Sequence, residues 1–169
     1  MFINSFEIDI APVAKGRPMF SRWSVRTPDK TKDFETELLL KSKRFIKEQI
    51  KKGRPILIRL IFKRQLLKSM NKTKKKEALE YKRFPTQRPD LDNYIKTIDA
   101  LQEIAWHDDS QVVCILSSKI YAETPSIQID IVDISELFDA EDSYEKQFWM
   151  TCLGNCTGVN GKTLKDSLT

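Results

Sequence analysis

Residues 112–134 read VVCILSSKIYAETPSIQIDIVDI, and this stretch decides the fold class. Its two halves, Val112 to Ile120 and Ser126 to Ile134, are rich in Val and Ile, which favour strands. Glu123-Thr124-Pro125 between them has the composition of a turn. We therefore expect a pair of strands joined by a turn, as part of a larger sheet.

Two further strands are expected upstream. Phe6, Ile8 and Ile10 alternate with acidic residues, a period of two that buries one face of a strand. Ile56 to Phe62 is a dense aliphatic run that begins after Pro55, as a buried strand would. The sheet is therefore expected to draw strands from both ends of the chain.

Two main helices complete the expected fold. Apolar residues recur at helical spacing from Thr31 to about Lys52, and Gly53 follows as a stop signal. Asn93 to Ala105 carries a shorter apolar stripe of the same period. The element order predicts a single α+β domain with a mixed sheet over residues 1–134. Residues 135–169 are expected to be a C-terminal extension, to which no role is assigned.

Length and composition exclude several classes of protein. The chain has 169 residues, 40% of them hydrophobic, which excludes wholly disordered and low-complexity chains. Since there is neither an apolar run of membrane-spanning length nor a signal-peptide pattern, we expect no membrane association. Three cysteines are too few for a secreted disulfide framework, so we expect free thiols and a reducing cytoplasm.

Charge is divided unevenly along the chain, whose net charge is +5. Residues 11–89 hold 24 Lys and Arg against 7 Asp and Glu, or +17, whereas residues 90–169 hold 5 against 15, or −10. A basic first half favours a polyanion partner, and nucleic acid is the natural one. The alternative is an ordinary charged surface in contact with water.

The basic residues concentrate in two segments that lack a core pattern. Residues 11–30 are expected to form a long basic loop, and residues 65–88 an arm or a short exposed helix. These segments would contact the phosphate backbone and recognise the shape of the nucleic acid. The expected nucleic-acid contacts are Lys15, Arg17, Arg22, Arg26, Lys74, Lys75, Lys76 and Arg88.

The residues suited to chemistry lie in RPDLDNYIK at 88–96 and HDDSQ at 107–111. Asp90 and Asp92 are one residue apart at a helix entrance, where unpaired carboxylates would repel each other. A hard cation such as Mg²⁺ suits such oxygen ligands, and the turn at 108–109 can supply a third carboxylate. Lys96 lies one helical turn after Asp92. Alternatively, Asp92 only caps the helix and residues 108–109 only form a turn.

These motifs together resemble the RusA family of Holliday junction resolvases. The resemblance rests on PDLDN at 89–93 with Lys96, DAL at 99–101 and HDDSQV at 107–112. KGRP at 15–18 and RTP at 26–28 are similar to the Gram-positive and phage-type members, so the likeness spans about residues 6–134. The segment between Lys96 and Asp99 is one residue shorter than is usual in that family, which puts Asp99 in a different helical register.

The resemblance implies an activity and its residues. Asp90, Asp92 and Asp109 would bind the metal, with Asp108 as an alternative to its neighbour, and Lys96 would be a catalytic lysine. The protein would be a Mg²⁺-dependent endonuclease of DNA recombination and repair in the cytoplasm of a bacterial or phage-infected cell. As a homodimer it would resolve four-way junction DNA by paired symmetric nicks, which suits the two-fold symmetry of a junction.

Two other functional hypotheses fit the same sequence. One is a nucleic-acid binding module without catalysis, in which the acidic residues are structural. The other is a nuclease that acts on flaps or replication forks rather than on four-way junctions. The charge distribution and the carboxylates fit both.

Overall fold

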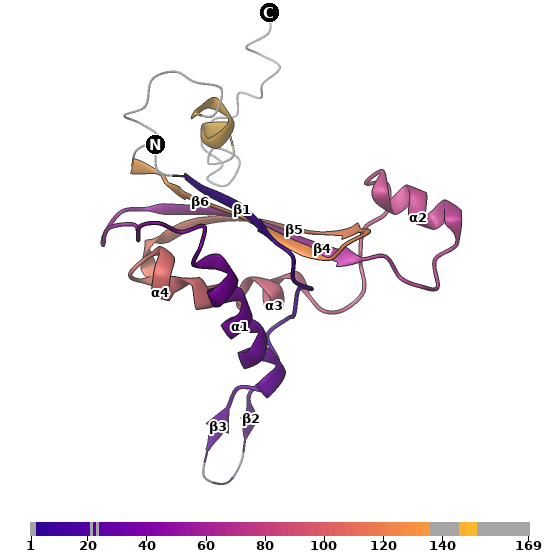
Figure 1. The fold of residues 1–169 in the computed structure, drawn as a ribbon, viewed down its shortest axis with the longest axis horizontal. Helices are drawn as coiled ribbons and strands as arrows, with labels where there is room; N and C mark the ends of the chain where they lie inside the picture. The colour runs from indigo at the N-terminus through magenta and orange to yellow at the C-terminus, as the bar shows by residue number, and fades with distance from the viewer. Residues whose placement is uncertain (1–2, 21, 23, 136–145, 152–169) are drawn as a thin grey trace, which may run out of the picture.

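The computed structural model describes residues 3–20, 22, 24–135 and 146–151. A four-stranded mixed sheet runs through it in the strand order β1-β6-β4-β5 (Figure 1). The strands are β1 (Ile3–Ile8), β4 (Ile56–Gln65), β5 (Val112–Ala122) and β6 (Ser126–Asp133). The expected α+β class with a mixed sheet is confirmed.

Strand β4 lies inside the sheet because it is apolar on both faces. Ile56 and Leu57, which point to opposite faces, are each 0% exposed. β4 pairs in parallel with β5 and antiparallel with β6. These two neighbours satisfy its backbone groups on both sides, as a fully buried strand requires.

The expected turn-linked pair of β5 and β6 is wrong, because β4 lies between the two strands. Residues 123–125 therefore cross the end of β4 instead of closing a hairpin. Two strand spacings amount to roughly 10 Å, a distance that three extended residues can span. A hairpin and this crossover can thus use a linker of the same length and composition.

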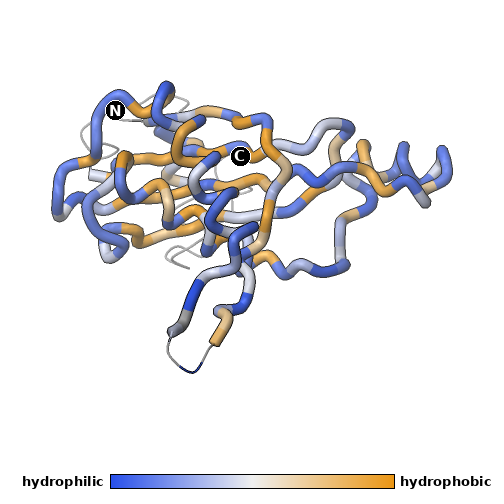
Figure 2. Tube along the Cα trace, turned by 60° about the horizontal axis from the view of Figure 1, so that its bottom comes forward, coloured by the Kyte–Doolittle hydropathy of each residue, from blue (hydrophilic) through white to orange (hydrophobic). Residues whose placement is uncertain are grey.

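One face of the sheet is covered by helices, and the main core lies between them and the strands (Figure 1). The covering elements are α1 (Asp29–Ser42), α3 (Leu91–Ile95), the 3₁₀ helix η1 (Ile98–Leu101) and α4 (Gln102–Ala105). Figure 2 shows hydrophobic residues recurring along the strands of this layer. The largest fully buried side chains of this core include Phe62, Ile8, Leu38, Leu60, Leu101 and Trp106.

The first helix is shorter than its apolar spacing predicted. It was expected to reach about Lys52, but α1 ends at Ser42. The Ser42 hydroxyl donates a 2.7 Å hydrogen bond to the carbonyl of Leu38, a back-bond that weakens helix continuation. Ile50 still reaches the core, but from an isolated bridge with Trp106. Its helical spacing thus reflects burial rather than helical geometry.

The second helix, expected from Asn93 to Ala105, is divided into α3, η1 and α4. The division falls at Thr97, whose buried hydroxyl donates a 2.7 Å hydrogen bond to the carbonyl of Tyr94. A threonine that bonds to nearby backbone in this way competes with regular helix geometry. The segment therefore turns as it crosses the sheet.

Two basic elements project from the body of the molecule (Figure 1). A hairpin of β2 (Met19–Phe20) and β3 (Val25–Arg26) lies within the segment expected to be a basic loop. Helix α2 (Lys72–Leu79) lies within the predicted arm, and Asn71 caps it by accepting a 2.9 Å hydrogen bond from the backbone N–H of Lys74. The prediction of a short exposed helix in this arm is confirmed.

The face of the sheet opposite to α1 carries a helical segment at residues 146–151 (Figure 1). Trp149 from this segment is 5% exposed and packs in a second apolar cluster with Leu57. The guanidinium of Arg59 lies 5.3 Å from the centroid of the Trp149 ring and 2.7 Å from buried Asp130. These contacts fix part of the C-terminal extension on the sheet.

The remainder of that extension, residues 136–145 and 152–169, lies outside the described residues, as do Cys152 and Cys156. Cys114 on β5 is disulfide-bonded, so the expectation that it is a free thiol is wrong. Within the part of the chain that the structure describes, every helix is too short or too polar to cross a membrane.

Candidate active site

The motif at 88–96 forms the entrance to α3. Asp90 is the N-cap residue, with an extended backbone, and its side chain makes no capping hydrogen bond within the described residues. The loop before it is held from β5, because the Lys119 ammonium donates to the carbonyls of Gln87 (3.2 Å) and Pro89 (2.9 Å). The exposed Asp90 carboxylate thus stands at the end of a fixed loop.

Asp92 and Lys96 form an exposed pair one helical turn apart. The Lys96 ammonium donates a 2.9 Å hydrogen bond to the Asp92 carboxylate, and the two side chains are 54% and 63% exposed. This hydrogen bond and the lysine's charge hold the pKa of Asp92 below its usual range. The i,i+4 spacing predicted that the two side chains share a face, and they do.

After Lys96, the C-cap of α3, the backbone changes from α to 3₁₀ geometry in η1. A 3₁₀ helix rises about 2.0 Å per residue and an α-helix about 1.5 Å. Four residues of η1 therefore cover about the length of five α-helical residues. Asp99 is placed at the same cavity as Asp109.

The turn at 108–109 gives its two carboxylates different environments. Asp108 caps the 3₁₀ helix η2 (Asp109–Gln111), and its carboxylate accepts a 2.8 Å hydrogen bond from the backbone N–H of Ser110. Hydrogen bonding to Ser110 holds the pKa of Asp108 below its usual range. Asp109 is turned toward the cavity instead. Of the two neighbours, Asp109 has the carboxylate that faces the candidate site.

Gln111 fixes this turn to the rest of the domain. Its side-chain oxygen accepts from the backbone N–H groups of His107 and Asp108, both at 3.1 Å. Its amide nitrogen donates to the carbonyls of Lys51 (2.9 Å) and Arg54 (3.1 Å). A buried amide with four hydrogen bonds leaves the turn few alternative positions.

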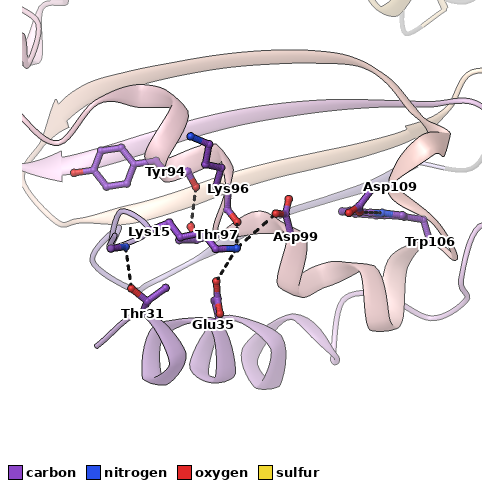
Figure 3. Close-up of polar contacts among 10 residues, drawn as sticks. Lys15, Thr31, Glu35, Tyr94, Lys96, Thr97, Asp99, Trp106 and Asp109 are labelled. Carbon is purple, nitrogen blue, oxygen red and sulfur yellow. Dashed lines mark hydrogen bonds and ion pairs between the residues drawn. The ribbon is translucent and has the colours of Figure 1, made fainter. Parts of the chain in front are cut away.

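Asp109 is also held by the core. The indole N–H of Trp106, a side chain only 2% exposed, donates a 3.3 Å hydrogen bond to one carboxylate oxygen of Asp109 (Figure 3). Both residues line a cavity of about 200 Å³ whose other walls are mainly apolar. Asp99 is the second acid in that lining. The two carboxylates therefore lie at the exposed rim of one apolar cavity.

The surroundings of Asp99 oppose its ionisation. Partial burial raises the pKa of Asp99, the negative charges of Asp109 and Glu35 raise it further, and the positive charge of Lys15 acts in the other direction. The Lys15 ammonium lies 3.8 Å from Asp99 and 3.6 Å from Glu35. Figure 3 shows Lys15 between these acids, with Asp109 and Trp106 beyond Asp99. Asp99 and Asp109 are thus electrostatically coupled.

The donor chemistry of this site fits a hard divalent cation, although the expected trio is not assembled. Among the described residues, no three His, Cys, Asp or Glu side chains lie close enough together to hold a metal. Asp99 and Asp109 are two carboxylates with coupled charges at one cavity. Since Mg²⁺ is commonly held by one or two carboxylates together with substrate phosphate oxygens, Asp99 and Asp109 fit such an ion, and Asp90 and Asp92 stand apart from that pair.

The expected DNA contacts lie in four places. Arg17, Arg22 and Arg26 lie on or beside the β2–β3 hairpin, and all three are exposed. The lysines at 74–76 lie on α2, and Arg88 is exposed just before the α3 entrance. Lys15 lies in the loop before β2, and its ammonium is 3.6 Å from Glu35 and 3.8 Å from Asp99.

Comparison with known proteins places the chain in a family. Residues 9–132 match the family model described as "Endodeoxyribonuclease RusA". The chain belongs to the RusA endodeoxyribonuclease family. It is also 37% identical over 131 residues to the "Uncharacterized protein YqaN" of Bacillus subtilis (strain 168), a match that covers 73% of this chain and 92% of that protein.

The RusA match includes every acidic residue of the candidate site and ends before the helical segment at 146–151. The family is one of DNA nucleases, as the sequence predicted. Sequence reasoning missed how Asp109 is held. The order Asp108-x-x-Gln111 matches a capping box and was a usable signal for one support. The indole of Trp106 had no such signal, because its bond to Asp109 depends on how the core is packed.

Proposed function

We propose that this protein is a Mg²⁺-dependent endonuclease that resolves four-way DNA junctions by paired symmetric nicks. The observation that carries the proposal is the placement of Asp99 and Asp109 at one cavity, in a chain of the RusA endodeoxyribonuclease family. Asp109 is the proposed metal-binding carboxylate at this cavity, and Asp99 is added because it lines the same cavity. Asp90 and Asp92, which stand apart from that pair, are proposed as further metal-binding carboxylates, and Lys96 as the catalytic lysine.

The chain's own residues would divide the work of phosphodiester hydrolysis. A bound divalent cation supplies charge for the phosphoryl oxygen and an activated water. Trp106 and Gln111 hold Asp109 in one orientation before DNA arrives, so little reorganisation is required. Lys96 is exposed and exchanges its bond to Asp92 for contact with a phosphate oxygen, where its charge stabilises the transition state.

DNA binding is proposed for the two basic projections and the α3 entrance. The residues are Arg17, Arg22, Arg26, Lys74, Lys75, Lys76 and Arg88, all within the segment whose net charge is +17. Elements that extend from the body (Figure 1) can follow separate arms of a junction, which favours recognition of shape over base edges. If about 6 to 10 phosphates are contacted, raising salt from 50 to 200 mM should weaken binding by roughly 10³ to 10⁵.

A homodimer is proposed because two symmetric cuts need two sites related by a two-fold axis. Strand β5 supports it, since β5 is an outer strand of the sheet and carries Val113, which is 60% exposed. An exposed apolar edge is a template for pairing with a second strand. Light scattering of Val113→Asp should show monomers where the unchanged protein shows dimers.

The test of the activity compares substrates in one assay. A labelled synthetic four-way junction, a flap, a fork and the matching linear duplex are incubated with Mg²⁺ or with chelator. Symmetric nicks in the junction alone, dependent on Mg²⁺, are the expected result. Preferential cutting of flaps or forks would replace the junction by another substrate, and metal-independent binding without cutting would indicate a binding module.

Asp90→Asn and Asp92→Asn should each abolish cutting while leaving junction binding intact, because the amide keeps the shape without the charge.

A further inference from the structure

Lys15 connects three elements around the acidic cavity. Its backbone N–H donates a 2.7 Å hydrogen bond to the carbonyl of Asn93 in α3. Its ammonium donates a 3.3 Å hydrogen bond to the carbonyl of Lys96, at the C-terminal end of the same helix. The ammonium also lies 3.6 Å from Glu35 on α1 and 3.8 Å from Asp99 on η1. Figure 3 shows the Lys15 ammonium directed toward both Glu35 and Asp99.

The charge of Lys15 is directed into the protein rather than toward a ligand outside it. Its side chain is 36% exposed and is ion-paired with two carboxylates. A DNA phosphate that approached this ammonium would also approach Glu35 and Asp99, whose negative charges repel it. Arg17, two residues further along the loop, is exposed. The two basic residues of the KGRP motif are therefore placed for different tasks.

The contacts of Lys15 fall on both sides of the α3–η1 junction. The carbonyl of Lys96 is one of the helix-terminal acceptors that continuing α-helix would otherwise satisfy, and Lys15 supplies its donor. Asp99 follows three residues later and forms its ion pair with the same ammonium. One side chain thus fixes both the end of the helix that carries Lys96 and the carboxylate of Asp99, which lines the same cavity as Asp109.

We propose that Lys15 is a positioning residue of the acidic site. It acts on the reaction through Asp99 and the α3–η1 junction and does not contact DNA phosphate. The inference rests on the proposed nuclease function for its effect on rate. Its effect on structure and on DNA binding is independent of that function.

The first test uses metal-free protein and compares Lys15→Met with Arg17→Met. Methionine keeps most of the side-chain length and removes the charge. In Lys15→Met, the amide hydrogens of Lys96 and Thr97 should exchange with solvent at least about 10-fold faster, because the segment between α3 and η1 has lost its contacts with the ammonium. The affinity of this variant for a four-way DNA junction should stay within about twofold, with the same salt dependence. In Arg17→Met, exchange should be unchanged, junction affinity should fall, and the slope of log affinity against log salt should become shallower by about 0.9.

The second test measures single-turnover cleavage at saturating junction and Mg²⁺. Lys15→Met should be about 10-fold slower, the lower end of the range for loss of an outer support of a metal site. Lys15→Arg keeps the charge and should restore most of the rate and the slow amide exchange. An arginine variant as impaired as the methionine variant would overturn the proposal.

The opposite pattern would also overturn it. If Lys15→Met weakens junction binding, makes the salt dependence shallower and leaves amide exchange unchanged, then Lys15 is a phosphate contact. If the unchanged protein fails to cut any four-way junction, the proposed junction-resolving function is refuted. The exchange and binding measurements would still decide the role of Lys15, because they use neither metal nor cleavage.

Discussion

Two pairs of charged side chains at the candidate site are held in different ways. Asp92 and Lys96 form an exposed pair on one helix, and each provides the other's charge partner. Asp99 and Asp109 come from separate 3₁₀ segments. The partly buried ammonium of Lys15 holds Asp99, and the buried indole of Trp106 holds Asp109. An exposed pair can exchange its partner for a phosphate or a cation at little cost, whereas the cavity pair is oriented before any ligand arrives. The first pair is suited to respond to DNA and the second to preorganise the site.

The largest effect is expected where preorganisation and charge coincide. Asp109→Asn should lower the single-turnover cleavage rate by about 10³ or more, since it removes a proposed metal-binding charge. Asp108→Asn is the matched control, because its carboxylate caps the turn and does not line the cavity. It should change the rate by less than about 10-fold. Equal losses in the two variants would remove the distinction between these neighbours.

The exposed pair is tested next. Lys96→Ala should lower the same rate by about 10², the scale for loss of one electrostatic group that acts in the transition state. Junction affinity should change little, since many other Lys and Arg residues bind the backbone. A rate equal to that of the unchanged protein at saturating Mg²⁺ would show that Lys96 only pairs with Asp92.

The indole support should have a smaller effect than the carboxylate it holds. Trp106→Phe keeps an aromatic ring in the core and removes the N–H that bonds Asp109. The rate should fall by about 10-fold, with a higher Mg²⁺ requirement, as is typical for supports behind metal ligands. In the Asp109→Asn background the same change should have almost no further effect. If the losses of rate in the two single variants add up fully in the double variant, then Trp106 does not act through Asp109.

The smallest expected effect is on the stability of the fold. Near pH 7, replacing the acid should raise stability in the cavity pair and lower it in the exposed pair. The pKa of Asp99 is raised, so its stabilising contribution is present below its ordinary value of 3.8 and is lost as pH rises through the raised pKa. Asp99→Asn should therefore raise the urea midpoint of metal-free protein near pH 7 but not near pH 3.

The pKa of Asp92 is lowered, so its contribution is present above 3.8 and lost in acid. Asp92→Asn should lower the midpoint near pH 7, and that difference should shrink in acid.

The sequence predicted what local spacing controls. The Asp92–Lys96 contact followed from a four-residue interval, and each of the four strands of the main sheet was located by its own pattern. Pairing was not predictable in the same way, because a linker with turn composition serves a hairpin and a crossover equally. The position of Asp99 depended on a local change from α to 3₁₀ geometry, for which no residue in the sequence was a clear signal. The bond from Trp106 to Asp109 required the packed core.

The order of the sheet also constrains how the protein is made. β6 is the last strand of the sheet in the chain, yet it lies between β1 and β4 and pairs with both. Until residues 126–133 have left the ribosome, β1 has no partner and one side of β4 is open. Because distant contacts form slowly and open strand edges invite association, the nascent chain is exposed to aggregation until its last strand emerges. A chain truncated before β6 should therefore accumulate as aggregate rather than as a smaller folded domain.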